Sequence, residues 1–273
     1  MYLFLVDETN KNPVHGNFFI LGGLVFTPEQ VAAVHQAVQR IRAEHGYQDG
    51  DSFKFQTAAR PPHVTVEQSR QAKEQVIAAL GEAGVRLLTY VVLHDIAMNQ
   101  DEQKVMEMGL NTITWAYYRL LRADSAEGSM LIDRDDKQHN YLAHLFQHGV
   151  QPGSHPLSMQ DRILLYGQTS NNASHLSSAV DIALGGFRYC VNAASRETEK
   201  ESEQVVAANI FAPLSKLLWG VQRPDVRQVG GYGFHTRPSD VRKPAFAAKY
   251  DELRAKLASY SNSSTTGDTA SPS

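Results

Sequence analysis

The chain opens with Tyr2-Leu3-Phe4-Leu5-Val6-Asp7-Glu8-Thr9, five apolar residues followed directly by two carboxylates. An unbroken apolar run of this length predicts a strand that is buried on both faces, and therefore a central strand of a sheet. A carboxylate at the end of such a strand lowers stability unless a cation lies close to it. Asp7 and Glu8 are therefore candidate ligands of a divalent metal ion, if other segments bring further carboxylates to the same place.

The composition is that of an ordinary globular protein. Its 273 residues suffice for one large α/β domain or two small ones. The formal net charge of -3 gives no general attraction to nucleic acid, so a polyanion would need a local patch or a metal. Cys190 is the only cysteine, which excludes an internal disulfide and a cysteine-based zinc cluster. No apolar run is long enough to span a bilayer, and no basic segment precedes the first strand, so we expect a cytoplasmic protein without a membrane partner.

The apolar and turn residues predict a strand meander followed by alternating strands and helices. A second strand at 17–26 forms a hairpin with the first, with a bulge or a close backbone approach at Gly22-Gly23. Thr27 and Pro28 begin the first of two helices within about 28–83. The later elements are expected at 85–93 (strand), 100–122 (helix), 129–133 (strand), 138–148 (helix), 162–167 (strand), 174–192 (helix) and 203–217 (helix).

This order predicts a ribonuclease H-like α/β fold. Strands that alternate with helices favour parallel pairing, because each crossover needs a dozen or more residues. We therefore expect a mixed sheet flanked by helices, with a helical insertion after the second strand. Asp7 lies on the first strand, Asp133 ends the strand after the long helix, and Asp181 lies on the helix after the last strand. Small residues around Gly185-Gly186 suggest that the helix carrying Asp181 lies close to the sheet.

Four segments resemble a family of bacterial and phage proteins with this fold, the domain of unknown function 3800 family. They are Leu5-Val6-Asp7-Glu8, Phe18 to Val25, Leu131-Ile132-Asp133-Arg134, and Val180-Asp181. The resemblance covers about residues 1–195. The family often has a Glu-x-Lys element before the middle of the domain, and here only Lys54 matches, because Ser52 occupies the position of the Glu.

The resemblance implies a metal-dependent nuclease or phosphodiesterase. Magnesium and manganese prefer oxygen ligands, and two-metal hydrolysis needs several carboxylates from different segments. Asp7, Asp133 and Asp181 would be ligands of two Mg²⁺ or Mn²⁺ ions, and Glu8 would be a further ligand or a base beside the ligands. Lys54 would hold a phosphate oxygen. A fourth acid could come from the long helix, as Glu102 or Glu107.

The C-terminal part is expected to be a helix and a basic, irregular extension at 196–258, followed by a disordered tail at 259–273. Between residues 216 and 256 nine Lys or Arg stand against four acids. Trp219, Tyr232, Phe234 and Tyr250 are interleaved with them. Basic residues among aromatics suit contact with single-stranded nucleic acid, so this segment is a candidate nucleic-acid surface.

One alternative remains open at this stage, and two others are weaker. The same fold could be a catalytically inactive module that binds nucleic acid or a protein. An α/β hydrolase or phosphatase has no support, since neither a Gly-x-Ser-x-Gly elbow nor an Asp-x-Asp after the first strand occurs. His144 and His148 have the i,i+4 spacing of a zinc pair, but no Glu follows the first of them as in a metalloprotease. The family resemblance also suggests a role in mobile elements or in phage defence, by analogy alone.

Overall fold

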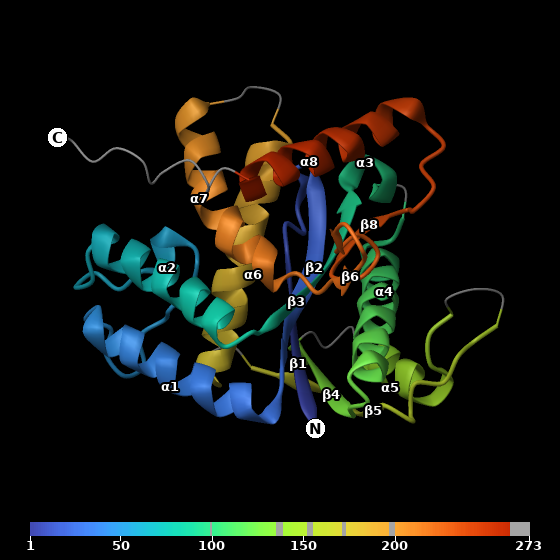
Figure 1. The fold of residues 1–273 in the computed structure, drawn as a ribbon, viewed down its shortest axis with the longest axis horizontal. Helices are drawn as coiled ribbons and strands as arrows, with labels where there is room; N and C mark the ends of the chain where they lie inside the picture. The colour runs from blue at the N-terminus through green and yellow to red at the C-terminus, as the bar shows by residue number, and fades with distance from the viewer. Residues whose placement is uncertain (99, 135–138, 152–154, 171–172, 197–199, 263–273) are drawn as a thin grey trace.

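The computed structural model describes residues 1–98, 100–134, 139–151, 155–170, 173–196 and 200–262. Its centre is a mixed six-stranded sheet in the order β5-β4-β1-β2-β3-β8, with helices on both faces (Figure 1). The expectation of an α/β protein with a mixed sheet flanked by helices is thus confirmed. None of the helices within these residues combines the length and the apolar character needed to cross a membrane.

The first three strands form the expected antiparallel meander. Strand β1 (Tyr2–Thr9) pairs with β2 (Phe18–Phe26), and β2 pairs with β3 (Arg86–Leu93). The register from β1 to β2 is continuous, so the Gly pair makes no bulge. It permits a close approach instead, because a Cβ on Gly23 would lie 1.9 Å from the carbonyl oxygen of Leu5.

Strand β4 (Gly128–Asp133) is parallel to β1, and β5 (Ile163–Thr169) is parallel to β4. Helix α4 (Glu102–Ala123), preceded by the short α3 (His94–Ala97), leads into β4. Helix α5 (His139–His148) connects β4 with β5. Strands β1, β4 and β5 therefore form the parallel part of the sheet that the alternating pattern predicts.

The two faces of the sheet carry separate cores. On one face Leu5, Ile20 and Leu24 pack with α1 (Pro28–Glu44), α2 (Val66–Glu82), α6 (His175–Ala194), α7 (Glu201–Leu217) and α8 (Pro244–Asn262). On the other face Phe4 and Val6 pack with α4 and α5. Figure 1 shows α1, α2, α6 and α7 on one side of the strands and α4 and α5 on the other, with α8 across the top of the view. Strand alternation therefore decides which core each residue of β1 faces.

The helical insertion forms as expected. Thr27 and Thr65 each accept a hydrogen bond from the backbone of the third residue of their helix, and the Gln at that position bonds back. Both α1 and α2 therefore begin with a complete capping box. The segment between them carries Lys54, and it lies on the side of the sheet where α6 packs.

The C-terminal part is more ordered than the sequence suggests. The expected irregular segment contains a short ribbon of β6 (Val221–Gln222) and β7 (Arg227–Gln228), then β8 (Phe234–Arg237), which adds a sixth strand parallel to β3. Helix α8 extends to Asn262, so residues 259–262 of the expected tail are helical. Residues 263–273 lie outside the described part of the chain. Tyr250 and Leu253 of α8 belong to the same core as α6, so the extension is part of one packed body.

Candidate active site

The acids predicted from β1, β4 and α6 face the same side of the sheet. Leu5 belongs to the core that contains α6, so alternation points Asp7 to that side as well. Leu131 of β4 pairs with Leu5 and packs against the same core, which places Asp133 on this face too. Helix α6 lies against the strands here, since a Cβ on Gly22 would be 3.1 Å from a methyl of Leu184.

Asp7 is a carboxylate in an unfavourable environment. Burial raises its pKa to about 7, and the charges of Glu8, Asp133 and Asp181 act in the same direction. The backbone N–H of Glu8 donates to Asp7 Oδ1 at 2.8 Å and partly offsets these effects. The charged groups with the largest influence on Asp7 are thus all carboxylates, contributed by three separate elements.

Asp181 is the acid with cations around it. Its Oδ2 accepts a hydrogen bond from the backbone N–H of Phe55 at 2.7 Å. Burial raises its pKa, whereas this hydrogen bond and the charges of Lys54, Arg188 and Lys73 lower it. The positive charge at the site therefore gathers on the α6 side of the acids.

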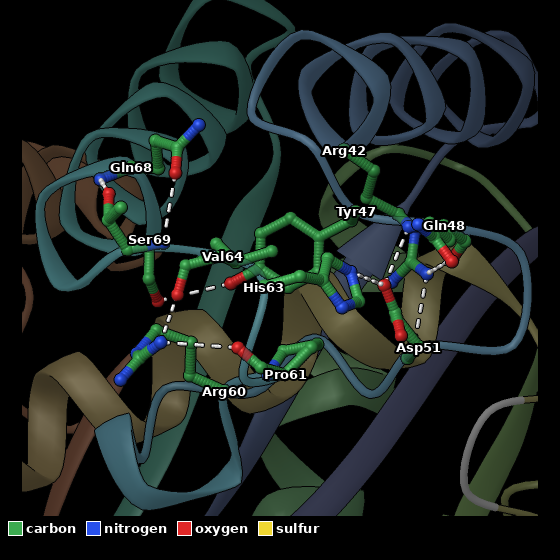
Figure 2. Close-up of polar contacts among 11 residues, drawn as sticks. Arg42, Tyr47, Gln48, Asp51, Arg60, Pro61, His63, Val64, Gln68 and Ser69 are labelled. Carbon is green, nitrogen blue, oxygen red and sulfur yellow. Dashed lines mark hydrogen bonds and ion pairs between the residues drawn. The ribbon is translucent and has the colours of Figure 1, made fainter.

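Polar contacts within residues 42–69 hold the segment that presents the Phe55 amide (Figure 2). The Arg42 guanidinium donates to the carbonyl oxygens of Gln48 and Asp51, at 3.1 and 2.9 Å. The Asp51 carboxylate contacts His63 at 3.0 Å, and Arg60 donates to the carbonyl of Val64. Backbone that is tied down in this way can present its N–H groups in a fixed geometry.

The same segment is anchored on α6. Phe53 is fully buried in the core. A Cβ on Gly185 would lie 2.4 Å from the Cβ of Phe55, and one on Gly186 would approach Leu214 of α7. The Gly pair of α6 therefore makes room for the Phe55 side chain and for α7. The sequence predicts that this Gly pair lets α6 lie close to the sheet. The close contact between α6 and the sheet is instead made at Gly22.

Glu8 and Lys54 have different surroundings. Glu8 alternates to the opposite face from Asp7, and its carboxylate pairs with Lys11 at 2.5 Å. Lys54 is half-buried, and its charge acts on Asp181. The structure thus gathers Asp7, Asp133, Asp181 and Lys54 in one region, whereas Glu8 contributes its charge to Asp7 while bound to a lysine.

The long helix supplies no clear fourth acid. Glu107 accepts a hydrogen bond from Gln103 at 3.0 Å, and its charge adds to burial in raising the pKa of Tyr141. Glu102, in the first turn of α4, lines a cavity of about 170 Å³ that Lys11 also lines. Neither acid is among the charges with the largest effect on Asp7 or Asp181.

The acids fit a divalent ion in chemistry. Asp7, Asp133 and Asp181 offer only oxygen donors, which suit Mg²⁺ or Mn²⁺, and the charges with the largest effect on the half-buried Asp7 are carboxylates. Within the described residues, however, no three His, Cys, Asp or Glu side chains are grouped closely enough to hold a metal ion. The rings of His144 and His148 lie 4.8 Å apart, but no third His, Cys, Asp or Glu of the described residues is grouped with them as a zinc ligand.

Two cationic residues near Asp181 do not stand out in the sequence. Arg188 lies seven residues after Asp181 on α6, and Lys73 lies on α2. Lys73 follows the helical spacing of the buried residues Ser69, Val76 and Leu80, so a lysine on an apolar face was its only signal. The Phe55 amide has no sequence signal, because any residue except proline would supply the same N–H group.

The C-terminal aromatics do not form the expected stacking surface. Trp219 is 7% exposed and Tyr250 is 1% exposed. The Tyr250 hydroxyl donates to the carbonyl of Arg237 and accepts from the amide of Leu93. Phe234 packs against Phe187 in the core. Base stacking on Trp219 or Tyr250 is therefore ruled out by burial.

Comparisons of the sequence with protein-family models and with curated proteins find no match.

Proposed function

We propose that the chain is a divalent-metal-dependent nuclease or phosphodiesterase of the ribonuclease H-like class, related to the domain of unknown function 3800 family. The sheet order supports the fold, because an antiparallel meander β1-β2-β3 beside parallel β4 and β5 is the arrangement expected of that class. Strand β8 is an addition at the far edge of the sheet. A role in phage defence rests on the family resemblance alone.

One observation carries the proposal. Asp7 sits at the end of a central strand, half-buried, and the charges with the largest effect on it are those of Glu8, Asp133 and Asp181. A fold that needed only structural polar groups would place a cation there, because like charges in a poorly solvated site are costly and the Glu8 amide offsets only part of that cost. A divalent cation that binds between these acids would offset that cost.

The residues have distinct roles in this proposal. Asp7, Asp133 and Asp181 would hold Mg²⁺ or Mn²⁺, and Glu8 would support them from the other face. When bound, such ions supply an activated water and stabilise the leaving oxygen of a phosphodiester. The Phe55 amide donates to one oxygen of Asp181, so the other oxygen would be the one that binds the metal. Lys54 binds a non-bridging oxygen of the phosphate that reacts.

The test is a cleavage assay on single- and double-stranded DNA and RNA with Mn²⁺ or Mg²⁺. We expect the wild type to cut at least one substrate, and Asp7→Asn and Asp181→Asn to abolish cutting. Calorimetry should show Mn²⁺ binding that both substitutions weaken. Asp225→Asn, at an exposed position, is the matched control and should behave as wild type. Cutting that persists in both site variants would reject these residues as the active site.

A second candidate is a module of the same fold that binds nucleic acid or a protein without cutting. The observation in its favour is that the acids of the described residues are not grouped as metal ligands, with Glu8 bound to Lys11 and Ser52 in place of a carboxylate. Oligonucleotide binding that is unaffected by Mn²⁺, together with no cleavage of any substrate, would favour this module over the nuclease.

A further inference from the structure

Three cations act on Asp181 and have no carboxylate or carbonyl partner in the described part of the chain. Lys54, Lys73 and Arg188 each lower its pKa through their charge. None of the three donates a hydrogen bond or forms an ion pair within the part of the chain that the structure describes. Cations that stabilise the fold usually bind a carboxylate or a carbonyl, as Arg42 does in the neighbouring segment.

Lys73 is the most informative of the three. The residue is only 9% exposed, and its burial lowers the pKa of the ammonium group. Its Nζ lies 5.6 Å from the ring centre of Phe55, the residue whose amide binds Asp181. The stem of Lys73 is buried, but its ammonium group is not among the buried polar atoms that lack a partner, so it keeps contact with solvent. An ammonium group held in this way beside Phe55 can bind an anion there.

Arg188 extends the positive charge along α6. It lies two helical turns beyond Asp181, on the same side of the helix. Its side chain lines a cavity of about 410 Å³, together with Gln56, Tyr189 and Asn192. This volume is within the range of pockets that hold a small organic ligand, about 300–1,000 Å³. The half-buried Tyr189 ring adds an aromatic wall beside the arginine.

We infer that Lys73 and Arg188 form a phosphate-binding subsite, in which a nucleic-acid strand that leaves the acid cluster runs along α6 and places its next nucleotide in the cavity beside Tyr189. This inference rests on the proposed function and specifies its substrate as a polynucleotide that extends past the reacting phosphate. The acids hold one end of the site, and the two cations hold the phosphates that flank it.

The experiment measures binding of short fluorescein-labelled DNA and RNA oligonucleotides by anisotropy, with a chelator present to prevent cleavage. Lys73→Met and Arg188→Met should each weaken binding about tenfold at low salt, as expected for one lost charged hydrogen bond. Each should also reduce the slope of log affinity against log salt by about 0.7, the value for one phosphate contact on a single strand. The exposed Arg40→Met on α1 should change neither quantity.

Thermal unfolding separates binding from structure. Lys73→Met keeps the buried stem and removes an unpaired charge, so its melting temperature should equal or exceed that of the wild type. If Lys73→Met does not fold, the binding test depends on Arg188→Met alone, because the Arg188 side chain is only half-buried. Unchanged affinity and salt slope in the folded variants would overturn the subsite, and so would a wild type that binds neither oligonucleotide.

Hydrolysis of bis(4-nitrophenyl) phosphate with Mn²⁺ by the wild type and by Asp7→Asn tests the proposed function separately, because this ester has no flanking phosphate. If the wild type hydrolyses the ester while Lys73→Met and Arg188→Met bind oligonucleotides as the wild type does, the nuclease proposal stands and the subsite is rejected. If Lys73→Met and Arg188→Met bind more weakly but the wild type does not hydrolyse the ester, the subsite is supported and the result counts against the nuclease.

Discussion

Replacing Asp7 with Asn should stabilise the protein in the absence of divalent metal, and the gain should depend on pH. The ionised form of Asp7 is disfavoured in the fold by burial and by three neighbouring acids. Asn has nearly the same shape and remains neutral at every pH, and its Oδ1 can still accept the hydrogen bond from the Glu8 amide. Most substitutions at a well-packed position destabilise, so an increase would be a specific signature of this electrostatic strain.

The size of the effect follows from proton linkage. The pKa of Asp7 is about 7 in the fold, against an ordinary value of 3.8. The folded protein therefore holds a proton that the unfolded chain releases between these values, and its stability falls as the pH rises from about 4 to 7. At about 1.4 kcal/mol per pH unit, Asp7→Asn should gain about 2 kcal/mol at pH 5 and about 4 kcal/mol above pH 7.

Thermal unfolding with a chelator at several pH values is the assay. A gain of about 4 kcal/mol corresponds to about 8 °C in melting temperature for a chain of this size. Adding Mn²⁺ at pH 8 should raise the melting temperature of the wild type and not that of Asp7→Asn. The exposed Asp225→Asn should follow the wild type throughout. The reasoning fails if Asp7→Asn is no more stable than wild type at pH 8, or if its advantage does not grow with pH.

Three further predictions concern packing. Gly185→Ala should destabilise by about 1–3 kcal/mol in urea unfolding, since its Cβ would strike Phe55, whereas Gly81→Ala on open helix surface should stabilise by up to about 1 kcal/mol. Tyr90→Phe should leave the unfolding free energy unchanged or raised by about 1 kcal/mol, because the buried hydroxyl has no described hydrogen-bond partner. Burial raises the pKa of the Cys190 thiol, so a thiol reagent should label it only after unfolding.

The central part of the fold could be predicted because its signals are local. The apolar run before Asp7 and the strand ending at Asp133 are long, and each is followed by turn or helix residues. A continuous apolar strand must lie inside a sheet, and alternation then places Asp7 and Asp133 on the face that α6 covers. The order of the elements therefore predicts that these two acids share a face of the sheet, but it does not give the distance between them.

The C-terminal elements were harder to predict for two different reasons. Strand β8 has four residues and exists because β3 offers an edge to pair with, which no local pattern reveals. Helix α8 did carry a signal, since Tyr250, Leu253, Leu257 and Tyr260 recur at helical spacing and are buried. Its basic residues favour the prediction of a nucleic-acid surface, but two of the aromatic residues expected to stack on bases are buried in the core.

The helical insertion gives the site its uneven distribution of charge. Strands β1 and β4 bring Asp7 and Asp133, whereas the insertion between β2 and β3 brings the Phe55 amide and the cations of Lys54 and Lys73. A sheet without this insertion would keep those two strand acids but lose most of the positive charge near Asp181. In the proposed nuclease, the sheet would thus hold the metal, and the insertion together with α6 would hold the strand to be cut. Substitutions in the insertion should then weaken substrate binding before they weaken metal binding.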